Sequence, residues 1–305
     1  MSKLTNEFSW SKSRYDIFNE CRRKYYYHYY ASWGGWEPDV PAQTREIYIL
    51  KQLKNRWMWA GDVVHKCLQR VLDNLSKGIS PLPLEDILDL TRKSMRTDFR
   101  LSREGHYRQD PKSCALFEHE YQTQVTQEQW QQIAETAEYA LSNFFLSPTF
   151  LSIFYWPKQD ILEIENLASF EIEANKIYVK LDFCCRKGAQ IYIYDWKTGK
   201  NGPDVDFQMA CYALYVQKRW GIELNNCKII EYNLVDDRLN ILLLVPKICQ
   251  EIEEQILQSI GQMTGLLKDK QQNIACEADF PQNEHLGDCK WCNYLKVCRP
   301  EEDKC

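Results

Sequence analysis

The spacing of hydrophobic and polar residues divides the chain into a helical first half and a strand-rich second half. The pattern of the first 150 residues predicts helices and loops. Ser11 is a suitable N-cap for the first helix, which carries Tyr15 and Phe18, and Pro148 and Pro157 end the helical half. The further stretches that we expect to be helical are 23–30, 57–75, 84–103 and 113–146.

Short runs rich in β-branched and aromatic residues follow, and these are typical of strands. They are "DILEIE", "ASFEIEA", "KIYVKLDFCC" and "QIYIYDWK", followed later by "CKIIEYNLV" and "RLNILLLV". A helix is expected between the two groups at about 203–220, and a final one at about 247–268. This order, in which strands are followed by a helix and then by more strands, predicts a mixed α/β fold. Its sheet would be flanked by helices, with the early helices wrapped around it.

One predicted strand ends in charged residues. In "YIYDWKTGK", a period of two places Asp195 and Lys197 on one face and Trp196 on the other, and Thr198-Gly199 supplies the turn that ends the strand. A hairpin with the preceding run would bring Asp182 close to Asp195.

Two carboxylates that converge at strand ends can bind Mg²⁺ or Mn²⁺, because these ions prefer oxygen ligands. A lysine beside such a metal can orient or deprotonate a water and stabilise charge on a phosphate. Gln208 and Tyr212, four apart on the next predicted helix, could face the same site. The alternative is an ordinary surface hairpin with an Asp–Lys ion pair.

The charge and composition of the chain limit the partners and the cellular compartment that we expect. The net charge is −5 and the pI is near 5.7, so nucleic acid would have to bind a local basic patch. The first ten residues lack the apolar stretch of a signal peptide, and the longest aliphatic run, 241–245, is too short to span a bilayer. The thirteen cysteines are odd in number and mostly scattered. We therefore expect reduced thiols and a cytoplasmic location without membrane contact.

Three sequence segments resemble one nuclease family. "LDF", "YDWKTGK" and "FQMACYALY" look like the core of the PD-(D/E)XK nuclease superfamily, specifically its RecB-like branch. The opening "SWSKSRYDIFNECRRKYYYHYY" is similar to the N-terminal segment of that branch, and "GDVVHKCL" resembles its Gly-x-x-x-His helix. The matching segments run in the expected order from about residue 9 to 298.

The resemblance implies a role for each matching residue. His65, Asp182 and Asp195 would be metal ligands and Lys197 the catalytic lysine, with Gln208 and Tyr212 as supporting residues. The chain departs from the family pattern at two backbone-shaping positions, which are Val179 in place of a glycine and Arg22 in place of a proline.

His65 also has a simpler interpretation. On a helix it shares a face with Gly61, Leu68 and Leu72, so it points inward and could be a hydrogen-bonded core histidine. Gly61 on the same face permits the close approach of another backbone or of a strand end, which favours the ligand role. Glu163 and Glu165 could extend the acidic cluster, but their alternation with isoleucine also fits a half-exposed strand.

The cysteines near the C-terminus form a second group with metal-ligand spacing. "CKWCNYLKVC" contains Cys289, Cys292 and Cys298, and Cys305 is a local fourth candidate that would complete a zinc knuckle. In the iron–sulfur members of the RecB-like branch, one N-terminal cysteine joins three C-terminal ones around a 4Fe-4S cluster. Cys21 stands at the matching place, so the resemblance implies a structural cluster on Cys21, Cys289, Cys292 and Cys298.

The segment "RRKYYYHYY" mixes cations with aromatic rings, a composition that suits single-stranded nucleic acid. Arg22, Arg23, Lys24 and Tyr26 are the candidate contacts, and the alternative is that the tyrosines face the core. The basic residues from 45 to 56, with Trp57 and Trp59 after them, form a second candidate stretch.

The sequence thus predicts a divalent-metal-dependent DNA nuclease, an exonuclease acting on single-stranded ends. The chain lacks a P-loop, so a helicase or another repair or CRISPR partner would have to open a duplex. Similar small nucleases act in DNA repair or in CRISPR and mobile-element defence. The rival interpretations are a non-catalytic nucleic-acid-binding iron–sulfur subunit and a zinc protein with another activity.

We expect a helical region over 1–150, a nuclease core over 151–275 and a cysteine segment over 276–305, packed as one unit.

Overall fold

A five-stranded sheet forms the centre of the computed structural model, which describes residues 4–199, 205–242 and 246–300. Its strands, in spatial order, are β2 (Ile161–Ile164), β5 (Phe183–Lys187), β6 (Gln190–Lys197), β7 (Cys227–Asn233) and β8 (Arg238–Leu242). Neighbouring strands are antiparallel except β6 and β7, which are parallel and are joined through helix α9 (Val205–Trp220). The mixed α/β fold predicted from the sequence is confirmed.

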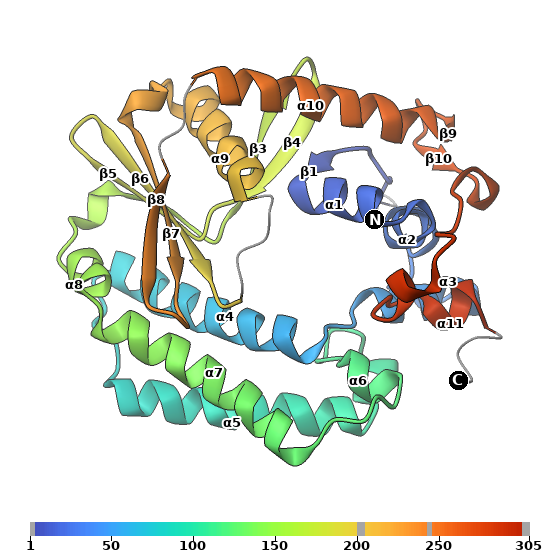
Figure 1. The fold of residues 1–305 in the computed structure, drawn as a ribbon, viewed down its shortest axis with the longest axis horizontal. Coiled ribbons are helices and arrows are strands. Elements are labelled where there is room, and N and C mark those ends of the chain that lie inside the picture. Colours follow the sequence, from blue (N-terminus) through green and yellow to red (C-terminus); the bar gives the residue numbers. More distant parts are fainter. Residues whose placement is uncertain (1–3, 200–204, 243–245, 301–305) are drawn as a thin grey trace.

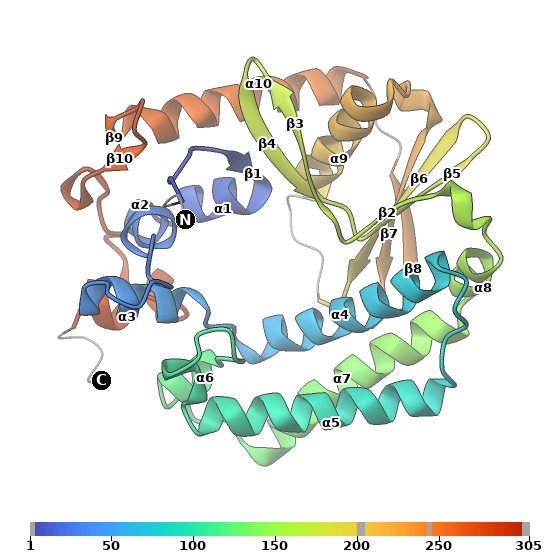
Figure 2. The same ribbon diagram turned by 180° about the vertical axis from the view of Figure 1, so that it is seen from behind.

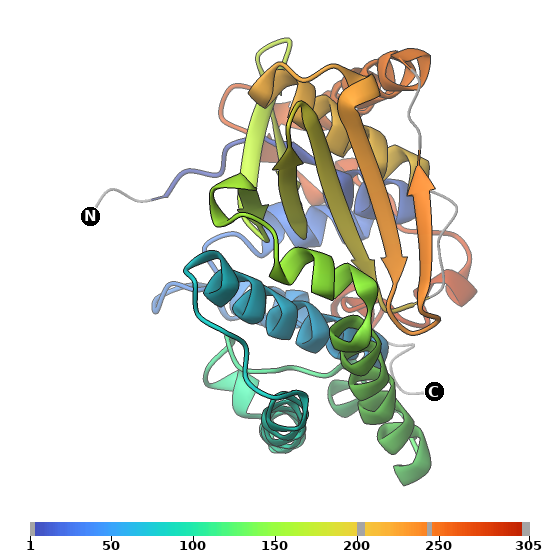
Figure 3. The ribbon, with the colours of Figure 1, turned by 90° about the vertical axis from the view of Figure 1, so that its left-hand side faces the viewer.

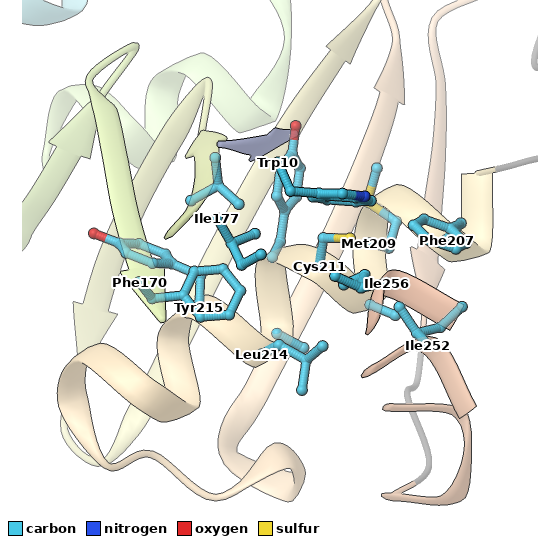
Figure 4. Close-up of a cluster of buried hydrophobic side chains, with 14 of the residues drawn as sticks. Trp10, Phe170, Ile177, Phe207, Met209, Cys211, Leu214, Tyr215, Ile252 and Ile256 are labelled. Atoms are coloured by element: carbon cyan, nitrogen blue, oxygen red, sulfur yellow. The ribbon is translucent and has the colours of Figure 1, made fainter. Parts of the chain in front are cut away.

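The side chains of β6 alternate between two cores. Ile191 and Ile193 are buried on the face covered by α9 and α10 (Pro246–Gly265), whereas Tyr194 and Trp196 pack on the opposite face against α4 (Arg56–Ser76) and α7 (Gln127–Leu146). Figure 3 shows the sheet above α4 and α7, and Figure 4 shows the first core, where Trp10 meets residues of α9 and α10. Helices on both faces therefore hold β6 rigidly up to its charged end.

The helical half largely matches the pattern of its sequence. Ser11 caps α1 as predicted, accepting a hydrogen bond from the Arg14 N–H at 3.1 Å. The predicted stretch 84–103 is helix α5, and α4 and α5 lie with α7 along one side of the molecule (Figure 1). The remaining helices of this half are α1 (Lys12–Glu20), α2 (Arg22–Tyr26) with a π-helical extension (Tyr27–Ala31), α3 (Ala42–Lys51), α6 (Phe117–Glu120) and α8 (Pro148–Phe154).

Three elements of the first half differ from the prediction. The expected helix 113–146 contains only the single turn α6 before α7 starts at its Thr126 cap. Helix α3 was not predicted, and Pro148 begins α8 instead of ending the helical half. A proline in the first turn of a helix leaves no hydrogen bond unmade, so the same residue that stops one helix can start another.

The predicted strand "KIYVKLDFCC" is interrupted at Leu181-Asp182. Its first part, β4 (Asn175–Lys180), forms a hairpin with β3 (Leu167–Ile172) and pairs with β1 (Trp10–Ser11) in a separate three-stranded sheet. Its second part is β5 of the central sheet. The chain changes sheets at Asp182, which therefore lies at the junction of the two sheets.

The first two helices lie against the C-terminal part of the chain. The Arg23 side chain donates to the Phe280 carbonyl at 2.8 Å and pairs with Glu277 at 2.6 Å, and Trp10 Nε1 donates to Ser259 Oγ at 2.9 Å. Figures 1 and 2 show α1 and α2 beside the C-terminal elements β9 (Leu267–Asp269), β10 (Ile274–Ala275) and α11 (Leu295–Cys298). No helix in the described part of the chain is both long and apolar enough to cross a membrane.

Candidate active site with metal-ligand chemistry

The two aspartates predicted to converge lie at the same end of the central sheet. Phe183 pairs with Tyr194 in the β5–β6 ladder, so Asp182 and Asp195 are the next positions along the two strands. Asp182 Oδ2 accepts a hydrogen bond from the Trp196 N–H at 2.7 Å, and both aspartates are buried. The hairpin expected from the sequence is therefore present, although Asp182 itself follows the sheet junction.

Lys197 and α9 contact Asp195 from one side. Lys197 Nζ lies 2.7 Å from Asp195 Oδ2 and donates to Gln208 Oε1 at 3.0 Å. The Tyr212 hydroxyl donates to Asp195 Oδ1 at 3.1 Å and accepts from Gln208 Nε2 at 2.6 Å. One turn of α9 thus holds both the carboxylate and the ammonium in fixed orientations.

His65 approaches the aspartates from α4, across the end of the sheet. Its Nε2 lies 3.1 Å from the Trp196 carbonyl, and its Nδ1 lies 3.4 Å from Asp182 Oδ1. Gly61, one turn earlier, allows this approach, because a Cβ there would lie 2.9 Å from Thr198 Oγ1. The neighbour that comes close to Gly61 is thus Thr198, the residue directly after β6.

Glu165 completes the cluster and was not selected from the sequence. Its Oε1 lies 2.9 Å from His65 Nδ1, its other oxygen pairs with Lys180, and its side chain is 3% exposed. The strand alternation of "ILEIE" gave no reason to choose it. The direction of the Glu165 side chain depends on the backbone. Glu165 lies just after β2 and has φ of 50°, and this left-handed turn redirects its side chain.

Burial and mutual repulsion make this group of charges sensitive to pH. Burial and the neighbouring Asp182 raise the pKa of Asp195 to about 6, although Lys197 and Tyr212 oppose the shift. Burial alone would lower the pKa of His65, but Asp182 and Glu165 raise it to about 10. With a pKa near 10, His65 is protonated at neutral pH and compensates these carboxylates, so a metal ion that binds its ring displaces a proton.

Among the described residues, His65, Glu165 and Asp182 offer ligand atoms that all lie within 4.8 Å of one another. Their two carboxylates and one imidazole are a donor set that suits Mg²⁺ or Mn²⁺. Asp195 is not one of these three, and its two oxygens contact Lys197 and Tyr212. The side chains present therefore fit a divalent cation at this end of the sheet.

The four cysteines expected to share a cluster line one small cavity, of about 20 Å³. Cys21 comes from the N-cap of α2, where its sulfur accepts the Lys24 N–H at 3.4 Å, and Cys289, Cys292 and Cys298 come from the C-terminal segment. Cys305 lies outside the described residues. The four cysteines that line this cavity offer thiols, which are the donors that an iron–sulfur cluster or a zinc ion prefers.

The basic-aromatic segment is largely occupied by internal contacts. Tyr25 is fully buried, the Arg22 guanidinium lies 3.5 Å from the Phe18 ring centroid, and Arg23 and Lys24 form ion pairs. Tyr26 is half-buried against the core. These contacts account for the segment as packing, and its contact with nucleic acid stays a prediction.

Comparison with known proteins identifies a family that spans nearly the whole chain. The family model described as the PD-(D/E)XK nuclease superfamily matches residues 9–299. The chain matches no curated protein. Among solved structures, a crystal structure of a "Putative exonuclease" from Eubacterium rectale shows 14% identity and a TM-score of 0.32, covering 69% of this chain and 80% of that one.

Proposed function

The chain belongs to the PD-(D/E)XK nuclease superfamily, and we propose that it is a divalent-metal-dependent deoxyribonuclease that removes nucleotides from single-stranded DNA ends. The observation that carries this proposal is the convergence of Asp182, Asp195, Lys197 and His65 at one end of the sheet. A degenerate nuclease fold retained only for binding has no reason to keep all four.

We assign the metal to Asp182, Asp195 and His65, with Glu165 beside them. Bound there, Mg²⁺ or Mn²⁺ supplies Lewis acidity for activating a water and neutralising a phosphate. Asp182 is held by the Trp196 N–H and Asp195 by the Tyr212 hydroxyl, so both carboxylates are oriented before a cation binds. Pre-orientation of this kind is what makes a polar site effective in catalysis.

Lys197 is the group that we expect to meet the scissile phosphate. Its side chain is 26% exposed, whereas its partner Asp195 is almost completely buried, so the ammonium is the solvent-facing member of the pair. Gln208 fixes its direction through the 3.0 Å hydrogen bond. An ammonium in this position stabilises the negative charge that develops on the phosphate oxygens.

We further propose that Cys21, Cys289, Cys292 and Cys298 hold a 4Fe-4S cluster with a structural role, which places the protein in the iron–sulfur group of RecB-like nucleases. Their common cavity supports this assignment over a zinc knuckle, because Cys21 belongs to it. Proteins of this kind act in DNA repair or in CRISPR and mobile-element defence beside a partner that opens the duplex.

The decisive test is cleavage of end-labelled single- and double-stranded DNA with Mg²⁺, with Mn²⁺ or with chelator. We expect metal-dependent shortening of the single strand from an end. Lys197→Ala and Asp195→Asn should each reduce the rate at least about a hundredfold, because each removes charge stabilisation or a ligand.

Both variants should remain folded, since each residue lies at the end of its strand, and circular dichroism and the melting temperature check this. Cleavage at the wild-type rate by either variant would refute the active-site assignment. DNA binding by the wild type without cleavage under any metal condition would favour the non-catalytic binding subunit.

A further inference from the structure

A cleft lies next to the end of β6, the strand that carries Asp195 and Lys197. It has a volume of about 650 Å³, within the range of pockets that hold organic ligands, and Thr198 and Gly199 form one end of it. These two residues directly follow Lys197, so the cleft starts within two residues of the position that carries the ammonium.

The first turn of α4 presents an aromatic ring to the cleft. Trp57 lines it and is 50% exposed, which is unusual for a tryptophan in a well-packed helix. The Arg56 guanidinium lies 3.7 Å from the centroid of the Trp57 ring. The Trp291 ring meets Trp57 edge-on at 5.5 Å and is itself 37% exposed.

The ring is held in place by a buried ion pair. Glu118 Oε1 accepts the Arg56 backbone N–H at 3.0 Å and lies 3.1 Å from Arg56 Nη1, and the Glu118 side chain is only 1% exposed. The Arg56 guanidinium is therefore held by Glu118, and it holds the Trp57 ring through their stacking contact. A ring that is already immobilised loses little entropy when a ligand stacks on it.

The opposite wall of the cleft is polar and carries no acid. Gln129, Gln132 and Thr136 of α7 line this side with amides and a hydroxyl beside Ile133. None of the described residues that line the cleft is an aspartate or glutamate. A polyanion can therefore enter without repulsion, which is unexpected on a protein with a net charge of −5.

We propose that this cleft binds unpaired bases of the DNA strand whose phosphodiester lies at Lys197, with Trp57 as the stacking platform. The proposal rests on the nuclease function above and adds the site that selects single-stranded substrate. A base inside a duplex has both faces covered by its stacked neighbours, so stacking on Trp57 makes the cleft favour single strands over duplex.

The test measures binding of fluorescently labelled oligothymidylates in chelator, where no cleavage occurs. Trp57→Ala should weaken binding about 5- to 150-fold, the value typical of losing one base–aromatic stack. Trp57→Phe, which retains a ring, should recover most of the affinity. Tyr155→Ala removes a ring that is 74% exposed on another surface, and should bind as the wild type does.

Strands with a single abasic position separate stacking from a change in fold. Moving the abasic position along the strand should reveal at least one place where the wild type loses affinity and Trp57→Ala loses none. Equal affinity of the wild type and Trp57→Ala for intact strands, or an abasic penalty that is the same in both proteins at every position, would overturn the proposal.

The same measurements distinguish failure of this inference from failure of the proposed function. Cleavage of DNA by the wild type together with an unaffected Trp57→Ala variant would refute the cleft and leave the nuclease in place. Binding that depends on Trp57 without cleavage in Mg²⁺ or Mn²⁺ would refute the nuclease and leave the cleft in place.

Discussion

His65 lies between two carboxylates that a cation can share with it. We expect His65→Ala to raise the Mn²⁺ concentration needed for half-maximal cleavage by at least about tenfold, because the imidazole is the nitrogen ligand of the set. The iron content should not change. His119→Ala is the matched control, since His119 bonds to Ser102 in a remote helical region and should alter stability without altering metal dependence. Unfolding of His65→Ala with unchanged metal dependence would instead identify His65 as a core histidine.

The same residue gives the metal-free protein a distinct pH dependence. Asp182 and Glu165 raise the pKa of His65 from 6.5 to about 10 despite its burial, so the protonated imidazole stabilises the folded state. This stabilisation is fully present below about pH 6.5 and is lost as the pH rises towards 10. Urea unfolding of wild type and His65→Ala in chelator should therefore show a difference that shrinks between about pH 7 and about pH 9.5. A difference that grows with pH would contradict the assigned ion pairs.

At the scale of secondary-structure elements, the contact between α4 and the end of β6 depends on one glycine. A Cβ at position 61 would lie 2.9 Å from Thr198 Oγ1, so Gly61→Ala should push the α4 helix away from the strand that carries Lys197. We expect cleavage to fall several-fold, while the gain in helix propensity, about 0.5–1 kcal/mol, offsets much of the lost stability. Adding Thr198→Ala to Gly61→Ala removes the clashing atom and should restore part of the activity.

A second helical glycine provides the control. Gly261 in α10 is exposed and has no atom within 4 Å of an added Cβ, so Gly261→Ala should stabilise the protein by about 0.5–1 kcal/mol and leave cleavage unchanged. Chemical denaturation and the cleavage assay measure both effects. A loss of activity in Gly261→Ala equal to that in Gly61→Ala would show that close approach at position 61 is not the cause.

The secondary-structure elements also show where sequence patterns fail to predict the structure. The regular runs of β6 and α5 could be predicted because their side chains alternate or repeat over many residues. Helix α8 could not, since a proline marks helix starts and stops alike. Neither could the break at Asp182, because the residues before and after it are equally strand-like, and only the pairing of β4 with β1 and β3 separates the two strands.

The residues of the candidate site could likewise be predicted only where a local sequence pattern defines their positions. Asp182, Asp195 and Lys197 could be grouped because a two-residue period and a short hairpin define their relative positions. Glu165 was missed because its position depends on a left-handed backbone conformation that a non-glycine residue rarely adopts. The Trp57 cleft depends on α4, α7 and β6 together, and no local pattern connects these elements.

At the scale of the whole molecule, the proposed cluster would join residues 268 positions apart. Cys21→Ser should lose the iron and much of the thermal stability, since a cross-link over so long a segment restricts the unfolded chain by roughly 4–5 kcal/mol on the disulfide entropy model. Serine is itself a good N-cap, so the cap of α2 is preserved and cannot explain the loss. Iron analysis and the melting temperature measure the effect.

Cys305→Ser is the counterpart of that experiment and should change little. A zinc knuckle formed by the C-terminal segment alone predicts the reverse, with Cys305 essential and Cys21 silent. Zinc in place of iron and sulfide in the purified protein would support that rival directly.

The meeting of the two chain ends also fixes the order of events during translation. Cys21 leaves the ribosome 277 positions before Cys298, which at ordinary elongation rates is an interval of roughly a quarter of a minute to a minute. During that time α1 and α2 lack the partners that Glu277, Phe280 and Ser259 later supply. The nascent chain therefore carries an unprotected thiol and an uncovered aromatic surface until these later residues have emerged, and the proposed cluster could be inserted only after that point.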